Sequence, residues 1–106
     1  METLWIAMST FMHDSLDEIE RYIISKVKEI REQRGISQTS LSLAIGKSTS
    51  YISDIEAHSK TAKYNIKSLN LISKALGCSP KDFWPDQPIL DNKYEFVKEI
   101  EIKRKS

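Results

Sequence analysis

The sequence predicts an all-α domain. Apolar residues recur every three or four positions along most of the chain, which is the spacing of the buried face of a helix. Only three glycines and three prolines interrupt the 106 residues, and serine or asparagine precedes several of the apolar runs, as at helix N-termini. The length suits one domain with a single core, so we expect helices joined by short connections.

The first predicted helix begins at Ser15 and ends near Arg34, before Gly35. Ser15 and Glu18 have the spacing of a capping box, in which each side chain satisfies an amide of the first helical turn. The apolar face of this helix comprises Leu16, Ile19, Ile23, Val27 and Ile30. We interpret residues 1–14 as an N-terminal extension that precedes the folded domain.

Two short helices follow, and Gly46 separates them. Ser37 is the expected cap of the first and Ser48 of the second, while Gly46 permits the positive φ of a sharp turn. Their inner faces comprise Leu41, Ala44, Ile45, Ile52 and Ile55. Two helices joined in this way form a helix-turn-helix, whose second helix can enter a DNA groove. An ordinary helix–helix corner is the alternative that spacing alone leaves open.

Two more helices are predicted before the C-terminal segment. Asn65 caps the fourth and Gly77 ends it, with an apolar face of Ile66, Leu69, Ile72 and Leu76. The run Ser79-Pro80-Lys81-Asp82 places a cap, a proline and an acid in the order that opens a short fifth helix. This helix extends through Phe83 and Trp84, and residues 15–86 therefore form the predicted domain.

The C-terminal residues 87–106 form a predicted arm that contains a strand. Apolar and charged residues alternate from Lys93 onward, which places Tyr94, Phe96, Ile100 and Ile102 on one face. A single strand is unstable alone, so it needs the N-terminal segment or the same strand of a second subunit as its partner. We interpret the arm as a possible dimerisation strand.

Composition argues against several classes of function. The formal charge is +1, from 16 basic and 15 acidic residues, so a phosphate-binding surface must be a local patch. Cys78 is the single cysteine and has no partner for a disulfide or a zinc site. Catalytic motifs, metal motifs and apolar runs of membrane-spanning length are also missing from the sequence. We expect a cytoplasmic protein that is not an enzyme and binds no cofactor.

Two motifs carry a resemblance to a known family. Gly35-Ile36-Ser37-Gln38 opens the second helix, and Tyr51-Ile52-Ser53-Asp54-Ile55-Glu56 closes the third. Between about residues 15 and 84 the chain resembles the phage-repressor-like helix-turn-helix proteins of the Cro/C1, or XRE, type. The resemblance implies a five-helix lambda-repressor-like bundle that binds double-stranded DNA, commonly as a homodimer.

The resemblance also assigns roles to individual residues. It implies that the side chains that read bases are Thr49, Ser50 and Asp54. It implies that Gln38 contacts the DNA backbone and supports the reading helix. Further candidates for backbone contact or support are Lys47, Ser48, Tyr51, Lys60 and Lys63. Lys47 departs from the family's small or apolar residue and can reach phosphate, and the loop with Lys60 and Lys63 precedes a helix N-terminus. Arg31 and Glu56 occupy the positions of a structural ion pair. Solvated surface positions for Lys60 and Lys63, and a core position for Tyr51, are the alternatives.

The predicted function is sequence-specific DNA binding by a transcriptional repressor whose third helix reads the major groove. The chain departs from strong DNA binders because no basic side chain occurs from Ser48 to Ala57, and Asp54 adds a negative charge. We therefore expect modest affinity for each subunit. The alternative is an antitoxin or other interaction module whose C-terminal arm binds a toxin-like protein partner.

Overall fold

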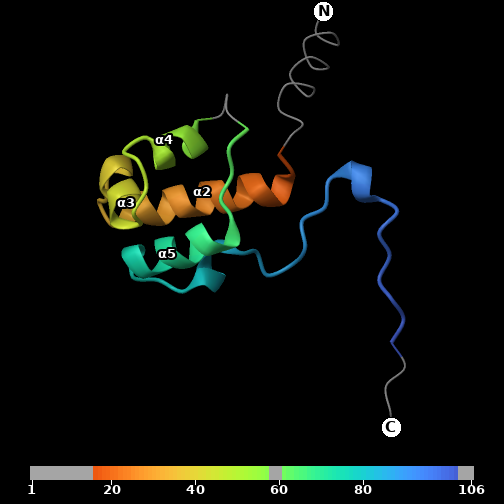
Figure 1. Ribbon diagram of the computed structural model, residues 1–106. Helices are drawn as coiled ribbons and strands as arrows, with labels where there is room; N and C mark the ends of the chain where they lie inside the picture. Colours follow the sequence, from red (N-terminus) through yellow and green to blue (C-terminus); the bar gives the residue numbers. More distant parts are fainter. Residues whose placement is uncertain (1–15, 58–60, 103–106) are drawn as a thin grey trace, which may run out of the picture.

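A computed structural model describes residues 16–57 and 61–102 of the chain. Within these residues the order of elements is α2 (Glu18–Gln33), α3 (Gln38–Ala44), α4 (Tyr51–Glu56), α5 (Ile66–Leu76), and the 3₁₀ helices η1 (Pro80–Phe83) and η2 (Asn92–Tyr94). In Figure 1, α2 crosses the molecule, with α4 above it, α5 below it and α3 at its left-hand end. The described residues contain no strand, and the predicted all-helical class is confirmed.

Every element from α2 to η1 contributes to a single hydrophobic core. The fully buried apolar residues come one from each element in turn: Val27, Leu41, Ile52, Ile72 and Phe83. Burying a side chain of this size is worth about 1.5–3 kcal/mol, so the short helices α3 and α4 are stabilised by packing and not by their own length. The core fixes α4 against α2 and α3.

Several helix ends lie where the sequence predicted them. The Ser37 hydroxyl accepts a hydrogen bond from the Ser40 amide at 3.0 Å, and the Asn65 side chain accepts one from the Ser68 amide at 2.7 Å. Gly46 has a φ of 74°, in the left-handed region that favours glycine. The predicted caps of α3 and α5 and the turn at Gly46 are therefore confirmed.

Two other predicted caps are wrong. The N-cap of α2 is Asp17, whose amide donates to Glu20 Oε1 at 2.9 Å, and the predicted cap Ser15 lies outside the described residues. The N-cap of α4 is Ser50 and not Ser48, because the Tyr51 amide donates to the Ser48 carbonyl and closes a turn before the helix. Residues 48–50 therefore lead into the helix as a turn.

The fourth and fifth predicted helices also need correction. Ile66 is 83% exposed because it is the first residue of α5 and lies off the face formed by Leu69, Ile72 and Leu76. The predicted fifth helix is the 3₁₀ helix η1, which has the expected capping box between Ser79 and Asp82. Within the described residues the domain thus has four α-helices instead of five.

The predicted C-terminal strand is absent from the described part of the single chain. Residues 92–94 form η2, and the Val97 amide donates to the Tyr94 carbonyl at 2.9 Å, so the chain turns where alternation predicted an extended strand. Phe96 contacts the Tyr94 ring, with centroids 6.2 Å apart. The described residues after this turn, 97–102, have no regular secondary structure.

The start of the arm is attached to the start of α2. Tyr94 Oη donates to Asp17 Oδ2 at 2.8 Å, Lys93 Nζ lies 2.8 Å from Asp17 Oδ1, and the Glu18 amide donates to Asp91 Oδ1 at 3.0 Å. We call these five residues the clasp. The hydrogen bonds from Lys93 and Tyr94 lower the pKa of Asp17, so its carboxylate stays ionised at neutral pH. The clasp joins residues more than 70 positions apart.

Tyr51, the first residue of α4, and Tyr64, shortly before α5, are neighbours that differ in hydrogen bonding. Their rings are 6.3 Å apart, and Tyr51 Oη donates to the buried Ser68 hydroxyl at 2.9 Å. Tyr64 Oη is buried without a hydrogen-bond partner among the described residues, and burial raises the pKa of this hydroxyl. The two hydroxyls therefore contribute oppositely to stability.

The pair gives a prediction with an internal control. Tyr51→Phe is expected to lower the free energy of unfolding by about 1 kcal/mol, because Ser68 loses its partner. Tyr64→Phe is expected to leave stability unchanged or to raise it by up to about 1 kcal/mol, because the buried hydroxyl makes no bond. Urea unfolding of both variants checks this, and an equal loss in both would contradict it.

Candidate nucleic-acid interface

The carboxylate of Glu56, at the end of α4, receives hydrogen bonds from two other elements. Arg31 on α2 donates from Nε to Oε2 at 2.9 Å and from Nη2 to Oε1 at 2.8 Å, in a bidentate pair. Gln38, at the start of α3, donates from Nε2 to Oε1 at 2.8 Å. The side chains of Arg31 and Glu56 are only 8% and 2% exposed. This ion-pair network links α2, α3 and α4 at one point.

The ion-pair network also removes charge from the domain surface. The hydrogen bonds to Glu56 raise the pKa of Arg31, so the guanidinium stays protonated beside the carboxylate. A third donor of Arg31, Nη1, bonds the Ile36 carbonyl at 2.8 Å and fixes the loop before α3. Burial of such a pair costs desolvation energy, so it specifies the helix arrangement more than it adds stability.

Ser42 provides a second polar link, between α3 and α4. This side chain is fully buried; its hydroxyl donates to the Gln38 carbonyl at 2.8 Å and accepts from the Ile52 amide at 3.0 Å. The Ile52 amide is in the first turn of α4, where no carbonyl within the helix can reach it. Sequence reasoning missed Ser42, whose only signal was a serine next to the inward-facing Leu41.

The three residues expected to read bases lie together at the start of α4. Thr49 and Ser50 precede the helix, Asp54 lies on its first turn, and all three are exposed. On the opposite side of this short helix Ile52 and Ile55 are buried. The packing thus leaves a polar, hydroxyl-rich side of α4 at the surface.

The residues expected to support the interface are only partly brought together. Lys47 and Ser48 are exposed beside Thr49, and Lys47 Nζ lies 5.4 Å from the centre of the Tyr51 ring, in a cation–π contact. Tyr51 is half-buried, and its bond to Ser68 ties α4 to α5. These contacts place a cation at the edge of the polar side of α4.

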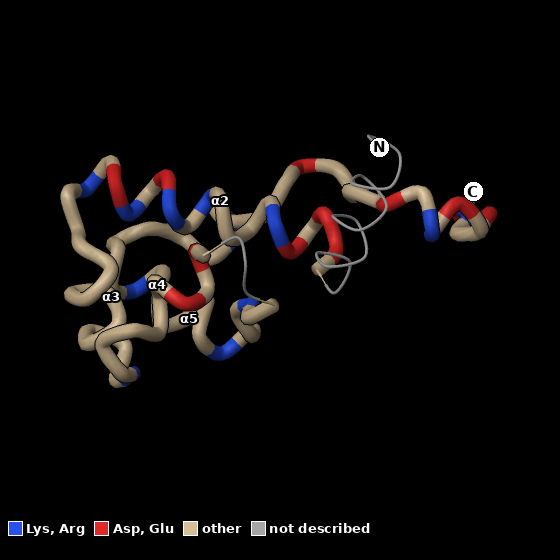
Figure 2. The backbone as a smooth tube through the Cα atoms, turned by 90° about the horizontal axis from the view of Figure 1, so that it is seen from above, with Lys and Arg blue, Asp and Glu red and all other residues tan. Residues whose placement is uncertain are grey.

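Of the two remaining lysines, the structure describes only Lys63, which pairs with α2. Lys63 Nζ lies 2.7 Å from Glu20 Oε2 on the first turn of α2, and this bond raises the pKa of Lys63. Lys60 lies outside the described residues. Figure 2 shows many charged residues along α2 and few on α3 and α4. Between residues 35 and 57 the sole basic residue is Lys47.

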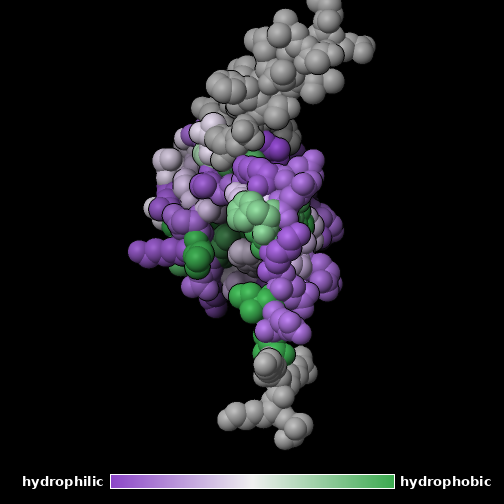
Figure 3. Space-filling model, turned by 90° about the vertical axis from the view of Figure 1, so that its right-hand side faces the viewer, coloured by the Kyte–Doolittle hydropathy of each residue, from purple (hydrophilic) through white to green (hydrophobic). Residues whose placement is uncertain are grey.

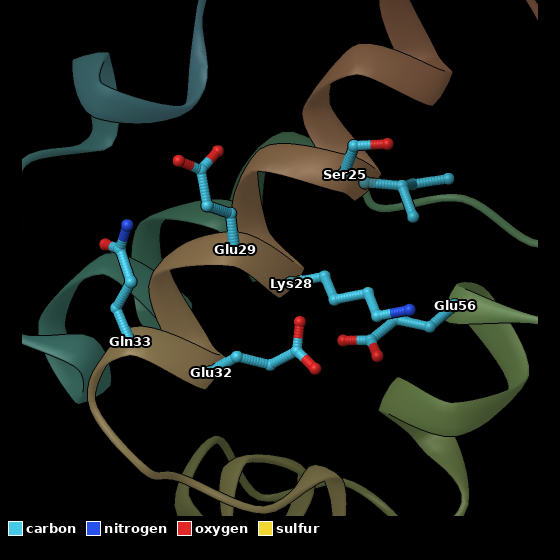
Figure 4. A pocket seen from close by; sticks show the side chains of 7 residues that line it. Ser25, Lys28, Glu29, Glu32, Gln33 and Glu56 are labelled. Atoms are coloured by element: carbon cyan, nitrogen blue, oxygen red, sulfur yellow. The ribbon is translucent and has the colours of Figure 1, made fainter.

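A groove of about 370 Å³ lies between α2 and the end of α4. Figure 4 shows the Lys28 and Glu32 side chains directed toward Glu56 across this groove. The residues that line the groove carry charges of both signs, and the Glu56 carboxylate already accepts hydrogen bonds from Arg31 and Gln38. Among the described residues no cluster of three metal-ligating side chains is found, and no described helix is long and apolar enough to cross a membrane.

The single cysteine is part of the packed domain. Cys78 is half-buried and packs against the hydrophobic core after the end of α5. Burial raises the pKa of its thiol, which therefore stays protonated at neutral pH. A structural position next to the core agrees with this chemistry.

The fold and the surface of α4 define a helix-turn-helix DNA-binding domain. The sequence profile of the helix-turn-helix family matches residues 27–83, more than half of the chain. The chain belongs to this family of XRE-type DNA-binding regulators, to which the Cro and C1 repressors also belong. A comparison with curated proteins finds no match.

The ion-pair network predicts strong coupling between two substitutions. Arg31→Met should lower the free energy of unfolding by about 3 kcal/mol, because it leaves the Glu56 carboxylate buried without its cation. Glu56→Met should cost a similar amount, whereas the double variant should cost much less than the sum. Urea unfolding of the four proteins gives the coupling energy. Additive losses would contradict a direct ionic contact.

Proposed function

We propose that this protein is a sequence-specific transcriptional repressor that binds DNA as a homodimer and reads the major groove with α4. The observation that carries the proposal is the exposed polar side of α4, opposite its buried apolar side. A major groove admits one α-helix, and the N-terminal residues of that helix contact the base edges. Thr49, Ser50 and Asp54 occupy such positions.

The proposed readout follows from the chemistry of these side chains. A serine or threonine hydroxyl can donate to or accept from base edges, and the threonine methyl can contact the methyl group of thymine. The Asp54 carboxylate can accept only, which favours the amino group of cytosine and disfavours nearby phosphates. The expected recognition is therefore selective and modest in affinity.

In the proposed complex, contacts to the DNA backbone come from residues beside α4. Lys47 and Ser48 precede the reading residues, and Gln38 is oriented by its bond to Glu56. Lys60 and Lys63 are further candidates because their loop leads to α5, although Lys63 must then exchange Glu20 for phosphate. So few cations give a weak electrostatic attraction, and two subunits on adjacent half-sites would compensate.

A second candidate function is an antitoxin or interaction module whose arm binds a toxin-like protein. The exposed apolar side chains of the arm favour some protein partner. This function is compatible with DNA binding by the same domain. Binding that depends on the arm and not on α4 distinguishes the two activities.

The reading role is tested with Thr49→Ala combined with Ser50→Ala. Without these hydroxyls, affinity for duplexes selected from a random DNA pool should fall about tenfold or more, with the melting temperature unchanged. Gln87→Ala with Asn92→Ala removes two exposed polar side chains of the arm, outside α4, and serves as the control. Fluorescence anisotropy over a salt series measures all three proteins.

Two results would contradict this proposal. One is an unchanged selected DNA sequence and affinity in the Thr49→Ala, Ser50→Ala protein. The other is a wild-type protein that binds no duplex at low ionic strength, where attraction to phosphate is strongest.

A further inference from the structure

The end of the arm exposes apolar side chains that have no cover in the described chain. Val97, Ile100 and Ile102 are 48%, 80% and 77% exposed, and the residues between them, Lys98, Glu99 and Glu101, are charged. Figure 3, which faces this end of the molecule, shows separate apolar side chains among hydrophilic ones. Backbone amides and carbonyls of residues 98–102 also make no helix or strand bonds. The segment has both requirements of an edge that pairs with another strand.

The clasp determines where this segment leaves the domain. Asp17 and Tyr94 hold the arm at the N-terminal end of α2, whereas α3 follows the opposite end of that helix. Figure 1 shows the arm and α3 at opposite ends of α2. A partner bound to residues 97–102 would therefore leave the exposed side of α4 free for DNA.

We propose that residues 97–102 pair antiparallel with the same six residues of a second copy of this chain. The proposal deepens the homodimer of the proposed function and rests on it. With all six residues overlapped, Lys98 lies opposite Glu101 of the second copy, and Val97 lies opposite its Ile102. Glu99 then lies opposite Ile100, and each pair occurs twice by symmetry.

Charge complementarity selects this arrangement over a parallel one. In the antiparallel pair, both lysines face glutamates, and no like charges lie directly opposite each other. In a parallel pair in the same register, each residue faces its own copy, so that like charges meet at Lys98, Glu99 and Glu101. Opposite charges and apolar pairs across strands stabilise a sheet, whereas like charges destabilise it.

The ribbon is short, so the dimer is expected to be weak in solution. Two strands without a third are marginally stable in water, although the clasp reduces the freedom that pairing must restrict. Two DNA half-sites raise the effective concentration of the paired arms and strengthen the same contact. Dimerisation should therefore be visible at high protein concentration without DNA and at low concentration with it.

Charge reversal tests the pairing in the full chain. Lys98→Glu and Glu101→Lys each turn two attractive pairs into repulsive ones, so each should raise the dimer dissociation constant about tenfold or more. Leu71→Lys with Leu90→Lys adds charge at two exposed apolar positions outside the segment and should leave the constant unchanged. Sedimentation equilibrium from micromolar to millimolar protein measures each constant.

Combining the two charge reversals shows whether the contact lies between two chains or within one. An equimolar mixture of Lys98→Glu and Glu101→Lys chains should form a heterodimer, because every pair is again attractive. The double variant should dimerise like the wild type. Restoration in the double variant without restoration in the mixture would place the contact within one chain and overturn the proposal.

A wild-type chain that stays monomeric at every concentration, alone and on DNA, would also overturn it, and a different protein would then be the partner of the arm. Anisotropy with duplex DNA at low salt separates this failure from failure of the proposed function. If the chain binds DNA only as a monomer, the proposed reading role of α4 is retained and only the arm pairing is rejected.

Discussion

The Glu56 carboxylate meets the Arg31 guanidinium and the Gln38 amide in a site almost closed to water. Three helices therefore share one set of charge-assisted hydrogen bonds, which are directional and shorter than neutral ones. Apolar packing alone tolerates shifts and rotations of short helices, because hydrophobic burial has no direction. The orientation of α4, a helix of only six residues, depends on this polar constraint.

The same constraint has an electrostatic consequence for the surface. Because Arg31 neutralises the buried Glu56, the exposed charged side chains of the described residues 35–57 are those of Asp54 and Lys47. In the proposed complex, discrimination between base pairs depends on hydroxyl groups and one acceptor, with little nonspecific attraction to phosphate. The proposed repressor compensates by binding with two subunits, and the clasp at Asp17 holds the arm at the end of α2 opposite α3.

Sequence patterns predicted the core and several helix ends because helical periodicity and caps are local. Asn65 and Gly77 could be predicted as the caps of α5 from neighbouring residues alone. Ser42 could not be predicted, because it bonds an amide ten residues away and has no periodic signal. The strand prediction at Tyr94 was wrong because its hydroxyl bonds Asp17, 77 positions earlier, which no short-range pattern contains. The roles of Thr49 and its neighbours came from resemblance, and their DNA contacts stay predictions.

The most direct measurement is an NMR titration of the ¹⁵N-labelled chain with a duplex selected from a random pool. If α4 reads DNA from an orientation fixed by Glu56, the largest amide shifts should fall on residues 47–54, with smaller ones at Gln38. Residues 97–102 should change only as the dimer forms. Shifts confined to the outer side of α2 or to the arm, with residues 47–54 unchanged, would contradict the account.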